Sequence, residues 1–392
     1  MRPLVLDVSR LLTGLRFAGP TGVETLELGL ARHLPPGPGL ALTPWGARKV
    51  APATLARIAD TAARRWREDE SDVTGQLAGV AAFLAGREVP RPAPRPDASL
   101  LSAMRFAPSL LGRVTSLPTD SVTLHTGFFR LEQPALFDWK AKRRDIGMIV
   151  AFHDILPLTH PDWFRPGEAA LHRARLVTAL KLADAITVPA KAVRDDVAEF
   201  ALEVGLKLPP LHVVNLPVAA RFATATPMAA DLPYMVIAGT IEPRKNHALL
   251  LEVWNRLGPD APKLIIAGRR GWANDAVFSA LDAKPANIME APGLSSGTLA
   301  RLIKGAAALL SPSLDEGFGL PVAEALSAGT PVIAADTPVY RELWGSRTVL
   351  VGPQDVDAWV EAVRVPPPRG AGFVRTDWPT YVSALRAIAG SV

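Results

Sequence analysis

The sequence predicts an α/β protein made of two Rossmann-like, doubly wound domains that face each other across a cleft. Three observations lead to this fold class. Short apolar runs typical of buried parallel strands alternate with helical patterns along most of the chain. The length of 392 residues is enough for two domains that each bury a core. Residues 307–335 hold two apolar runs around one helical pattern, which predicts a β-α-β unit.

The composition favours a large soluble enzyme and excludes several other classes. Hydrophobic residues make up 48% of the chain, and no apolar run is long enough to cross a bilayer. Asp7, Ser9 and Arg10 interrupt the first apolar run, so we expect no secretory signal. The chain has no cysteine, which excludes disulfides, a thiolate nucleophile and cysteine metal ligands. These features predict a cytoplasmic protein.

The chain opens with a buried-strand pattern at residues 4–8. A loop that contains Gly14, Gly19 and Gly22 follows, and then a helix from about Val23 to His33. The glycines make this strand-to-helix connection flexible.

Residues 35–120 carry the weakest signals. Proline-rich stretches at 35–44 and 90–97, which are typical of loops, lie on either side of an arginine-rich helical pattern over 51–87. The apolar stretch 100–114 fits a core helix broken at Pro108, or a segment that lies on a membrane surface.

Two strand-like runs in the middle of the chain each lead to a histidine. Residues 121–125 end at His125, and residues 146–152 are followed by His153. Taken by its position alone, such a histidine is most simply a hydrogen-bonded residue at a domain edge. No compact ligand spacing is present around His153, so we expect no metal site. Strands at 182–188 and 211–216, a helix at 190–200 and a linker at 223–233 complete this half.

The second half begins with a strand at 234–238 that delivers two cations to its C-terminal end. Arg244 and Lys245 precede a helix that starts near His247. A guanidinium fork and a compact ammonium together can neutralise a diphosphate. The alternative is two solvated charges, although cations are mildly unfavourable at a helix start. Further strands are expected at 263–268 and 288–290, with a helix-to-strand passage over 299–308.

Residues 311–336 contain the strongest pattern. The helix between the two strands is expected to begin at Pro321 and to stop at Gly329. Glu316 lies in the turn before this helix, and Glu324 lies about one helical turn inside it. The backbone N–H groups of residues 316–320 suit a phosphate or diphosphate at the helix start. The alternative is a capped helix whose two acids are solvated.

This stretch resembles the signature of the retaining family 4 glycosyltransferases of GT-B fold, in which two acids are separated by seven residues. Here the signature runs from Glu316 to Glu324 within EGFGLPVAEA. The resemblance implies a nucleotide-diphosphate sugar donor, with Glu316 by the sugar hydroxyls and Glu324 on the ribose. It also implies that Gly317, Phe318, Gly319 and Leu320 contact the donor.

Other segments resemble the same family. His153 stands in a segment similar to the family's HDxxP motif, which implies a contact with the donor sugar. Arg244 and Lys245 stand in a segment similar to GxxxPRKN, which implies a diphosphate contact. Gly22 resembles a first-loop glycine that contacts acceptor or phosphate, and the turn at Gly293 and Leu294 resembles the nucleobase turn. By this resemblance Glu316, His153 and Lys245 are the catalytic residues.

The resemblance implies a division of labour between the domains. Residues 1–227, with a C-terminal helix at 376–392 that crosses back, would form the acceptor side, and residues 232–372 the donor side. The expected reaction moves a mannose- or rhamnose-like hexose onto a saccharide or polyprenyl-linked acceptor in bacterial surface polysaccharide synthesis, with no metal or other cofactor. The alternatives are a catalytically silent nucleotide-sugar-binding scaffold, or a GT-B epimerase or phosphorylase-like enzyme.

Basic residues gather in the first half of the chain. The net charge is +5, and three clusters stand out: Arg64, Arg65 and Arg67; Arg87, Arg91 and Arg95; and Lys140, Lys142, Arg143 and Arg144. An anionic inner-membrane face or a phosphorylated acceptor would be attracted to them. A solvated surface is equally consistent. No aromatic interleaving accompanies the charge, so we expect no nucleic-acid partner.

Two further acids resemble a metal-binding motif of other glycosyltransferases. Asp355 and Asp357 form a DxD pattern, but they follow Gly352-Pro353 and open a helix. Helix capping therefore suffices to explain them.

Overall fold

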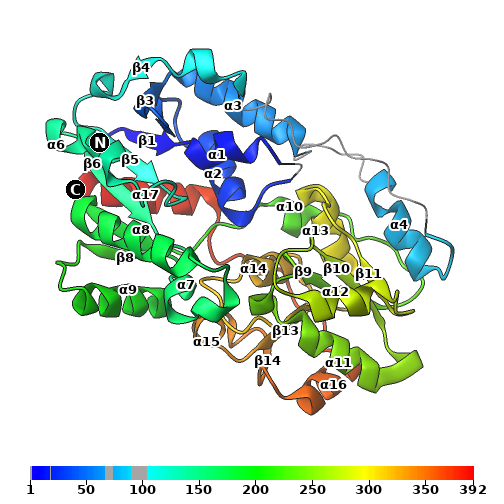
Figure 1. Ribbon diagram of the computed structural model, residues 1–392. Helices are drawn as coiled ribbons and strands as arrows, with labels where there is room; N and C mark the ends of the chain where they lie inside the picture. The colour runs from blue at the N-terminus through cyan, green and yellow to red at the C-terminus, as the bar shows by residue number, and fades with distance from the viewer. Residues whose placement is uncertain (1, 18, 67–73, 90–103) are drawn as a thin grey trace.

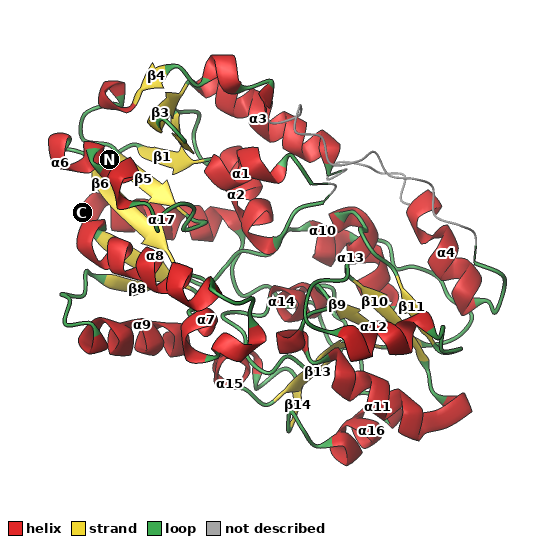
Figure 2. Cartoon of the chain, viewed as in Figure 1, coloured by secondary structure: helices red, strands yellow, loops and turns green. Residues whose placement is uncertain are grey.

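Two sheets, each flanked by helices, make up the protein (Figures 1 and 2). The computed structural model describes residues 2–17, 19–66, 74–89 and 104–392. The first sheet has the strand order β4-β3-β2-β1-β5-β6-β7-β8, and the second has the order β11-β10-β9-β12-β13-β14.

The strands of the first sheet are parallel except at one edge, where β3 pairs antiparallel with both β2 and β4. Its strands are β1 Leu4–Asp7, β2 Gly39–Thr43, β3 Gly46–Val50, β4 Gly112–Arg113, β5 Val122–His125, β6 Gly147–Ala151, β7 Ala185–Val188 and β8 Leu211–Val213. Helices of the first half are α1 Ser9–Gly14, α2 Gly22–His33, α3 Pro52–Arg65, α4 Thr74–Leu84, α6 Trp139–Lys142, α7 Leu156–Thr159, α8 Glu168–Leu182, α9 Lys191–Glu203 and α10 Arg221–Thr224.

The second sheet is parallel throughout. Its strands are β9 Tyr234–Ala238, β10 Lys263–Ala267, β11 Ile288–Glu290, β12 Ala308–Ser311, β13 Val332–Ala335 and β14 Val349–Val351. Its helices are α11 His247–Leu257, α12 Asp275–Asp282, α13 Ser296–Gly305, α14 Leu320–Ser327, α15 Pro338–Trp344 and α16 Val356–Arg364. The last helix, α17 Trp378–Ser391, packs on α2 of the first half, where the Trp378 ring stacks on His33 with centroids 4.7 Å apart.

Alternation along the buried strands separates two apolar cores. On β9, Val236 and Ala238 face a core that continues through the domain junction into the first sheet. Met235 and Ile237 face a smaller core beneath α11 and α16. The junction therefore lies within the larger core, and the first sheet and the near face of the second share one apolar interior.

Several local expectations for the first 120 residues were wrong. The connection after β1 is not all loop, because α1 occupies Ser9–Gly14. The proline-rich stretch 35–44 contains β2, since pairing with β1 outweighs the local punctuation. The single helical pattern over 51–87 is two helices, α3 and α4. No core helix spans residues 104–114, where a short 3-10 turn Ala107–Ser109 precedes β4; residues 90–103 lie outside the described part.

Candidate functional site

The order of the second sheet creates a binding position where β9 and β12 lie side by side. Strand β10 follows β9 on one side and β13 follows β12 on the other, so the connections diverge from this point. Ligands of doubly wound sheets bind where connections diverge in this way, beyond the carboxyl ends of the strands. The segments 239–246 and 312–319 leave β9 and β12 at that end.

A buried charged cluster joins these two segments. Glu316 accepts from Lys245 through one carboxylate oxygen and pairs with Arg244 at 2.7 Å through the other. Arg244 also donates to the backbone oxygen of Asp315 at 3.1 Å and to Glu242 at 3.1 Å. The Arg244, Lys245 and Glu316 side chains are only 14%, 13% and 10% exposed. The structure thus brings together three of the predicted site residues.

The cations fix the charge of Glu316. Burial opposes its ionisation, but Arg244 and Lys245 outweigh burial and lower the pKa of Glu316 to about 2. Burial raises the pKa of the neighbouring Glu242, although Arg244 acts against that shift. Glu316 is therefore an anion at neutral pH, suited to hold cations in place and poorly suited to accept a proton.

The acidic turn also touches the first domain. A Cβ atom on Gly317 would overlap the backbone carbonyl of His153 and lie 3.0 Å from Cβ of Asp154. Gly319 has a φ of +80°, and a Cβ there would overlap the ring of Tyr340. The two glycines of EGFG therefore permit close approach of backbone to backbone and backbone to ring.

His153 lies two residues after the end of β6, on the first-domain side of this contact. Its Nε2 donates to the backbone oxygen of Thr126 at 2.7 Å, which leaves Nδ1 as the acceptor of a neutral ring. Burial lowers the pKa of His153. A neutral histidine held in this tautomer can accept a hydrogen bond from a hydroxyl group.

Gly22, Leu320 and Glu324 come together in a separate hollow of about 100 Å³ between the domains. Gly22 begins α2, and a Cβ on it would lie 3.4 Å from the Leu320 side chain at the start of α14. Arg32, Arg221, Ser296 and Trp378 also line the hollow. This hollow is smaller than the roughly 300–1,000 Å³ that is typical of cofactor pockets.

The predicted nucleobase turn lies between β11 and α13. Gly293 has a φ of +67°, and the turn continues through Leu294 to Ser295. The Ser295 side chain caps α13 by accepting from the Thr298 N–H at 3.2 Å. The Ser295 N–H donates to Oε1 of Gln76 at 2.8 Å. A residue of α4 thus holds this turn.

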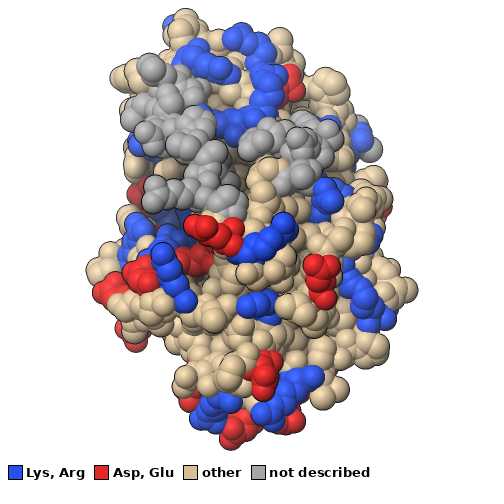
Figure 3. Space-filling model, turned by 90° about the vertical axis from the view of Figure 1, so that its right-hand side faces the viewer, with Lys and Arg blue, Asp and Glu red and all other residues tan. Residues whose placement is uncertain are grey.

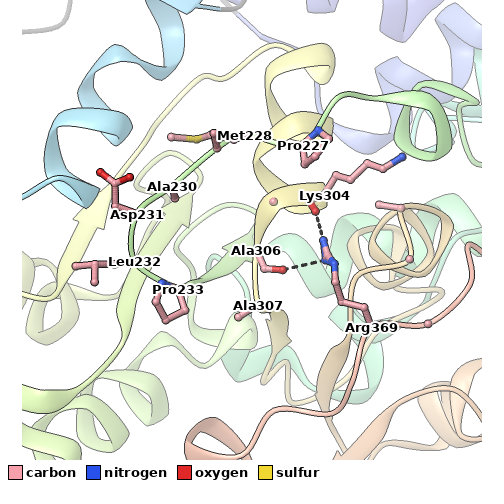
Figure 4. A pocket seen from close by; sticks show the side chains of 15 residues that line it. Pro227, Met228, Ala230, Asp231, Leu232, Pro233, Lys304, Ala306, Ala307 and Arg369 are labelled. Atoms are coloured by element: carbon pink, nitrogen blue, oxygen red, sulfur yellow. Dashed lines mark hydrogen bonds between the residues drawn. The ribbon is translucent and has the colours of Figure 1, made fainter.

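A larger hollow of about 820 Å³ lies elsewhere and involves none of the predicted site residues. Pro233 and Ala307, which precede β9 and β12, line it, so it opens at the N-terminal ends of these strands. Figure 4 shows Arg369 donating to the backbone oxygens of Ala306 and Lys304, which leaves its guanidinium engaged with the chain itself. The charged cluster lies at the opposite, C-terminal ends of β9 and β12.

A buried polar network beneath the first loop was not predicted from the sequence. Asp7 Oδ2 lies 2.8 Å from His125 Nδ1, and both residues are at most 3% exposed. Glu27 is 1% exposed and accepts from the Leu11 N–H at 2.8 Å. Burial and the nearby Asp7 raise the pKa of Glu27 well above its ordinary value. The signal was available in part, because an acid on the apolar face of a predicted helix is unusual.

Some residues of the basic clusters form ion pairs. Lys140 pairs with Asp184 at 2.9 Å and Arg143 with Asp145 at 2.6 Å, while Arg67, Arg91 and Arg95 lie outside the described residues. On the face in Figure 3, basic side chains gather at the first-domain end, and both signs are interspersed below. Asp355 caps α16 by accepting from the Ala358 N–H at 3.0 Å. Within the described ranges, no three His, Asp or Glu side chains group as metal ligands, and no helix is long and apolar enough to cross a membrane.

Comparison with known sequences identifies a family and several relatives. Residues 222–365 match the family described as Glycosyl transferases group 1. The serotype-specific mannosyltransferase WbdA of Escherichia coli is 31% identical over 249 residues, which cover 57% of this chain and 30% of WbdA. The O-antigen chain mannosyltransferase RfbU of Salmonella typhimurium is 28% identical over 220 residues, which cover 55% of this chain and 59% of RfbU. The chain thus spans less than two thirds of each of these relatives.

Solved structures match the whole chain. HepE from Anabaena, crystallised with UDP, aligns over 100% of both chains with a TM-score of 0.62 and 14% identity. Sucrose-phosphate synthase from Thermosynechococcus elongatus aligns over 100% of this chain and 97% of its own, with a TM-score of 0.57 and 15% identity. The predicted fold class is confirmed. The chain carries a glycosyl transferases group 1 domain at residues 222–365, within the two-domain α/β fold of the GT-B glycosyltransferases.

Proposed function

We propose that the protein is a retaining glycosyltransferase that uses a nucleotide-diphosphate sugar. The hexose, mannose- or rhamnose-like, is transferred to a saccharide or polyprenyl-linked saccharide in bacterial surface polysaccharide synthesis. The observation that carries this proposal is the buried Arg244–Glu316–Lys245 cluster at the point where β9 and β12 diverge. Relatives named as O-antigen mannosyltransferases support the choice of sugar and pathway class.

The donor would lie along the edge of the second sheet. Glu324 would bind the ribose, and the turn at Gly293 and Leu294 would meet the base. The backbone N–H groups at 317–320 and the two cations, Arg244 and Lys245, would hold the diphosphate. In this arrangement the protein itself supplies the positive charge for the leaving group, so the proposal includes no metal.

Transfer would break the bond between the sugar C1 and the diphosphate oxygen. The acceptor oxygen would form its bond to C1 on the same face, and its proton would pass to the departing phosphate. Lys245 and Arg244 would stabilise the negative charge that develops on that phosphate. Glu316, held ionised between them, would fix their positions. His153 would accept a hydrogen bond from a sugar hydroxyl through Nδ1.

The test begins with thermal shifts of the purified protein in UDP, GDP, ADP, CMP and dTDP, with Glu324→Ala beside it. A ligand at about 100 times its Kd should stabilise the fold by roughly 2.7 kcal/mol. One nucleotide that shifts the wild type and not the variant would establish the donor site. Donor binding without transfer to any acceptor would favour the silent scaffold, and phosphate-dependent turnover would favour a phosphorylase-like enzyme.

We also propose a cytoplasmic location, with peripheral contact between the basic first-domain end and the inner membrane face. The support is the gathering of Lys and Arg at that end of the molecule (Figure 3). Pelleting with vesicles of 30% anionic lipid, against neutral vesicles, tests this part. Equal pelleting with both kinds of vesicle would contradict it.

A further inference from the structure

Helix α4 belongs to the first half of the sequence but lies against the second sheet. Figures 1 and 2 show it beside β11 and well separated from the first sheet. Strand β11 is the edge of the second sheet. A Cβ on Gly79 of α4 would lie 3.5 Å from Met289 of β11, and Lys263 Nζ of β10 lies 4.9 Å from the Phe83 ring centroid.

Helix α4 is packed against the rest of the protein through one apolar face. Leu77, Val80 and Leu84 are at most 5% exposed and belong to the larger apolar core. Their spacing of three and four residues places them on one face of the helix. The face that carries Gln76 and Gly79 is therefore held in a fixed position over β11 and the turn that follows it.

Gln76 connects α4 to that turn. Its Oε1 accepts from the Ser295 N–H at 2.8 Å. Its Nε2 is shut off from solvent and has no hydrogen-bond partner among the residues that the structure describes. Both atoms are bonded to the same amide carbon, so Nε2 lies next to the 293–295 turn as well. A buried donor without a partner is costly, and a ligand carbonyl at this turn would satisfy it.

We infer that Gln76 is a specificity-determining residue for the nucleobase. Its Nε2 donates a hydrogen bond to a carbonyl oxygen of the base. This inference rests on the proposed function, because it needs a nucleotide at the 293–295 turn. It limits the donor to nucleotides whose base carries a carbonyl, such as uracil, thymine or guanine. Adenine has no carbonyl oxygen and is excluded. A site that pairs a buried polar group with its ligand rejects analogues that leave that group unpaired.

The test is isothermal titration of UDP, GDP, dTDP and ADP into the full-length wild type and three variants. Gln76→Leu removes both the acceptor for the Ser295 N–H and the donor proposed for the base. Gln76→Glu keeps an acceptor for Ser295 and loses the donor. Ala78→Gln, on the exposed side of the same helix, is the matched control.

The wild type should bind one carbonyl-bearing nucleotide at least tenfold more tightly than ADP. In both Gln76 variants the affinity for that nucleotide should fall about tenfold, and the affinity for ADP should change little. Ala78→Gln should bind both nucleotides like the wild type. Unchanged preference in Gln76→Glu, or a wild type that prefers ADP, would overturn the inference and leave the donor site standing. A wild type that binds no nucleotide would overturn the proposed function as well.

Discussion

The backbone carbonyl of His153 lies against the α-carbon of Gly317, so closely that no side chain fits between them. His153 follows a strand of the first sheet, and Gly317 lies in the acidic turn of the second. The two segments that resemble donor-sugar motifs thus meet across the domain junction. A substrate can be enclosed between them only if this contact opens and closes again.

Substitution of Gly317 by alanine should impair closure of the cleft. The added methyl group would overlap the His153 carbonyl, which belongs to the backbone and cannot rotate away. We expect transfer activity to fall at least 100-fold, and the melting temperature to fall as well, because the junction lies within the larger core. Gly370→Ala, where nothing lies within 4 Å, is the control. Full activity in Gly317→Ala would show that the loops need not approach this closely.

Removal of the Lys245 ammonium should slow transfer. By analogy with the loss of one donor to a developing anion, Lys245→Ala should lower kcat by about 10²–10³. The measurement is release of nucleotide diphosphate with donor and acceptor saturating. Lys207→Ala, an exposed lysine of the first half, should turn over normally. Near-normal turnover in Lys245→Ala would remove this residue from the mechanism.

Loss of the Glu316 charge should abolish activity and weaken the fold. Glu316→Gln removes the anion that Arg244 and Lys245 share, and breaking a buried pair costs about 3–5 kcal/mol. The folded pKa of about 2 is below the ordinary 4.5, so this stabilisation is present above pH 4.5 and lost as pH falls toward 2.

Urea unfolding of both proteins between pH 7 and pH 3 tests this expectation. The difference in unfolding free energy should be large at pH 7 and should shrink below pH 4.5. Glu361→Gln, which removes an exposed pair with Arg364, should cost little at any pH. A difference that stays constant with pH would contradict the prediction.

The stability of the Glu27→Gln variant relative to the wild type should increase as pH rises. The raised pKa means that folded Glu27 keeps a proton which the unfolded chain has already lost above pH 4.5. Its favourable contribution is therefore present at low pH and is lost as pH rises through the folded pKa, by up to about 1.4 kcal/mol per unit. Glutamine does not titrate. In urea unfolding, the unfolding free energy of the variant should therefore rise relative to that of the wild type from pH 5 to pH 8. Parallel curves for the two proteins would refute this.

Asp196 should make the domain junction sensitive to pH. It lies on α9, and burial, together with Asp315 of the acidic turn and the neighbouring Glu199 and Asp195, raises its pKa to about 6, while His160 acts in the opposite direction. The junction should be tightest below pH 4 and loosen as pH rises through 6. Hydrogen exchange of residues 312–319, corrected for intrinsic rates, should show this loosening in the wild type. Exchange in Asp196→Asn should not depend on pH in this way.

The sequence was sufficient to predict that the three residues of the charged cluster lie at strand ends, but not that they pair with one another. Arg244, Lys245 and Glu316 each follow a strand of the second sheet, and adjacent parallel strands end at the same edge. Most strands of the second half were also foreseen from their apolar runs, whereas α12, α15 and β14 were not.

Contacts between distant segments left no local signal. The Pro189-Ala190 sequence gives α9 no side-chain cap of its own, yet the Glu342 carboxylate accepts from the N–H groups of Lys191 and Ala192 at 2.8 and 3.0 Å. The two ends of this contact are 151 residues apart in the chain. The same is true of Gln76 and Ser295, which only the docking of α4 brings together. Strand β2 was missed for the opposite reason, because the local prolines were given more weight than its pairing with β1.

The position of α4 has a consequence for how this protein can be divided. A fragment made of the second sheet and its own helices would lack residues 74–84, and Met289 and the edge strand β11 would be bare. Exposed strand edges pair with one another, so such a fragment should self-associate. The two halves of this protein are therefore not separable modules, because a helix supplied by the first half packs on the second sheet.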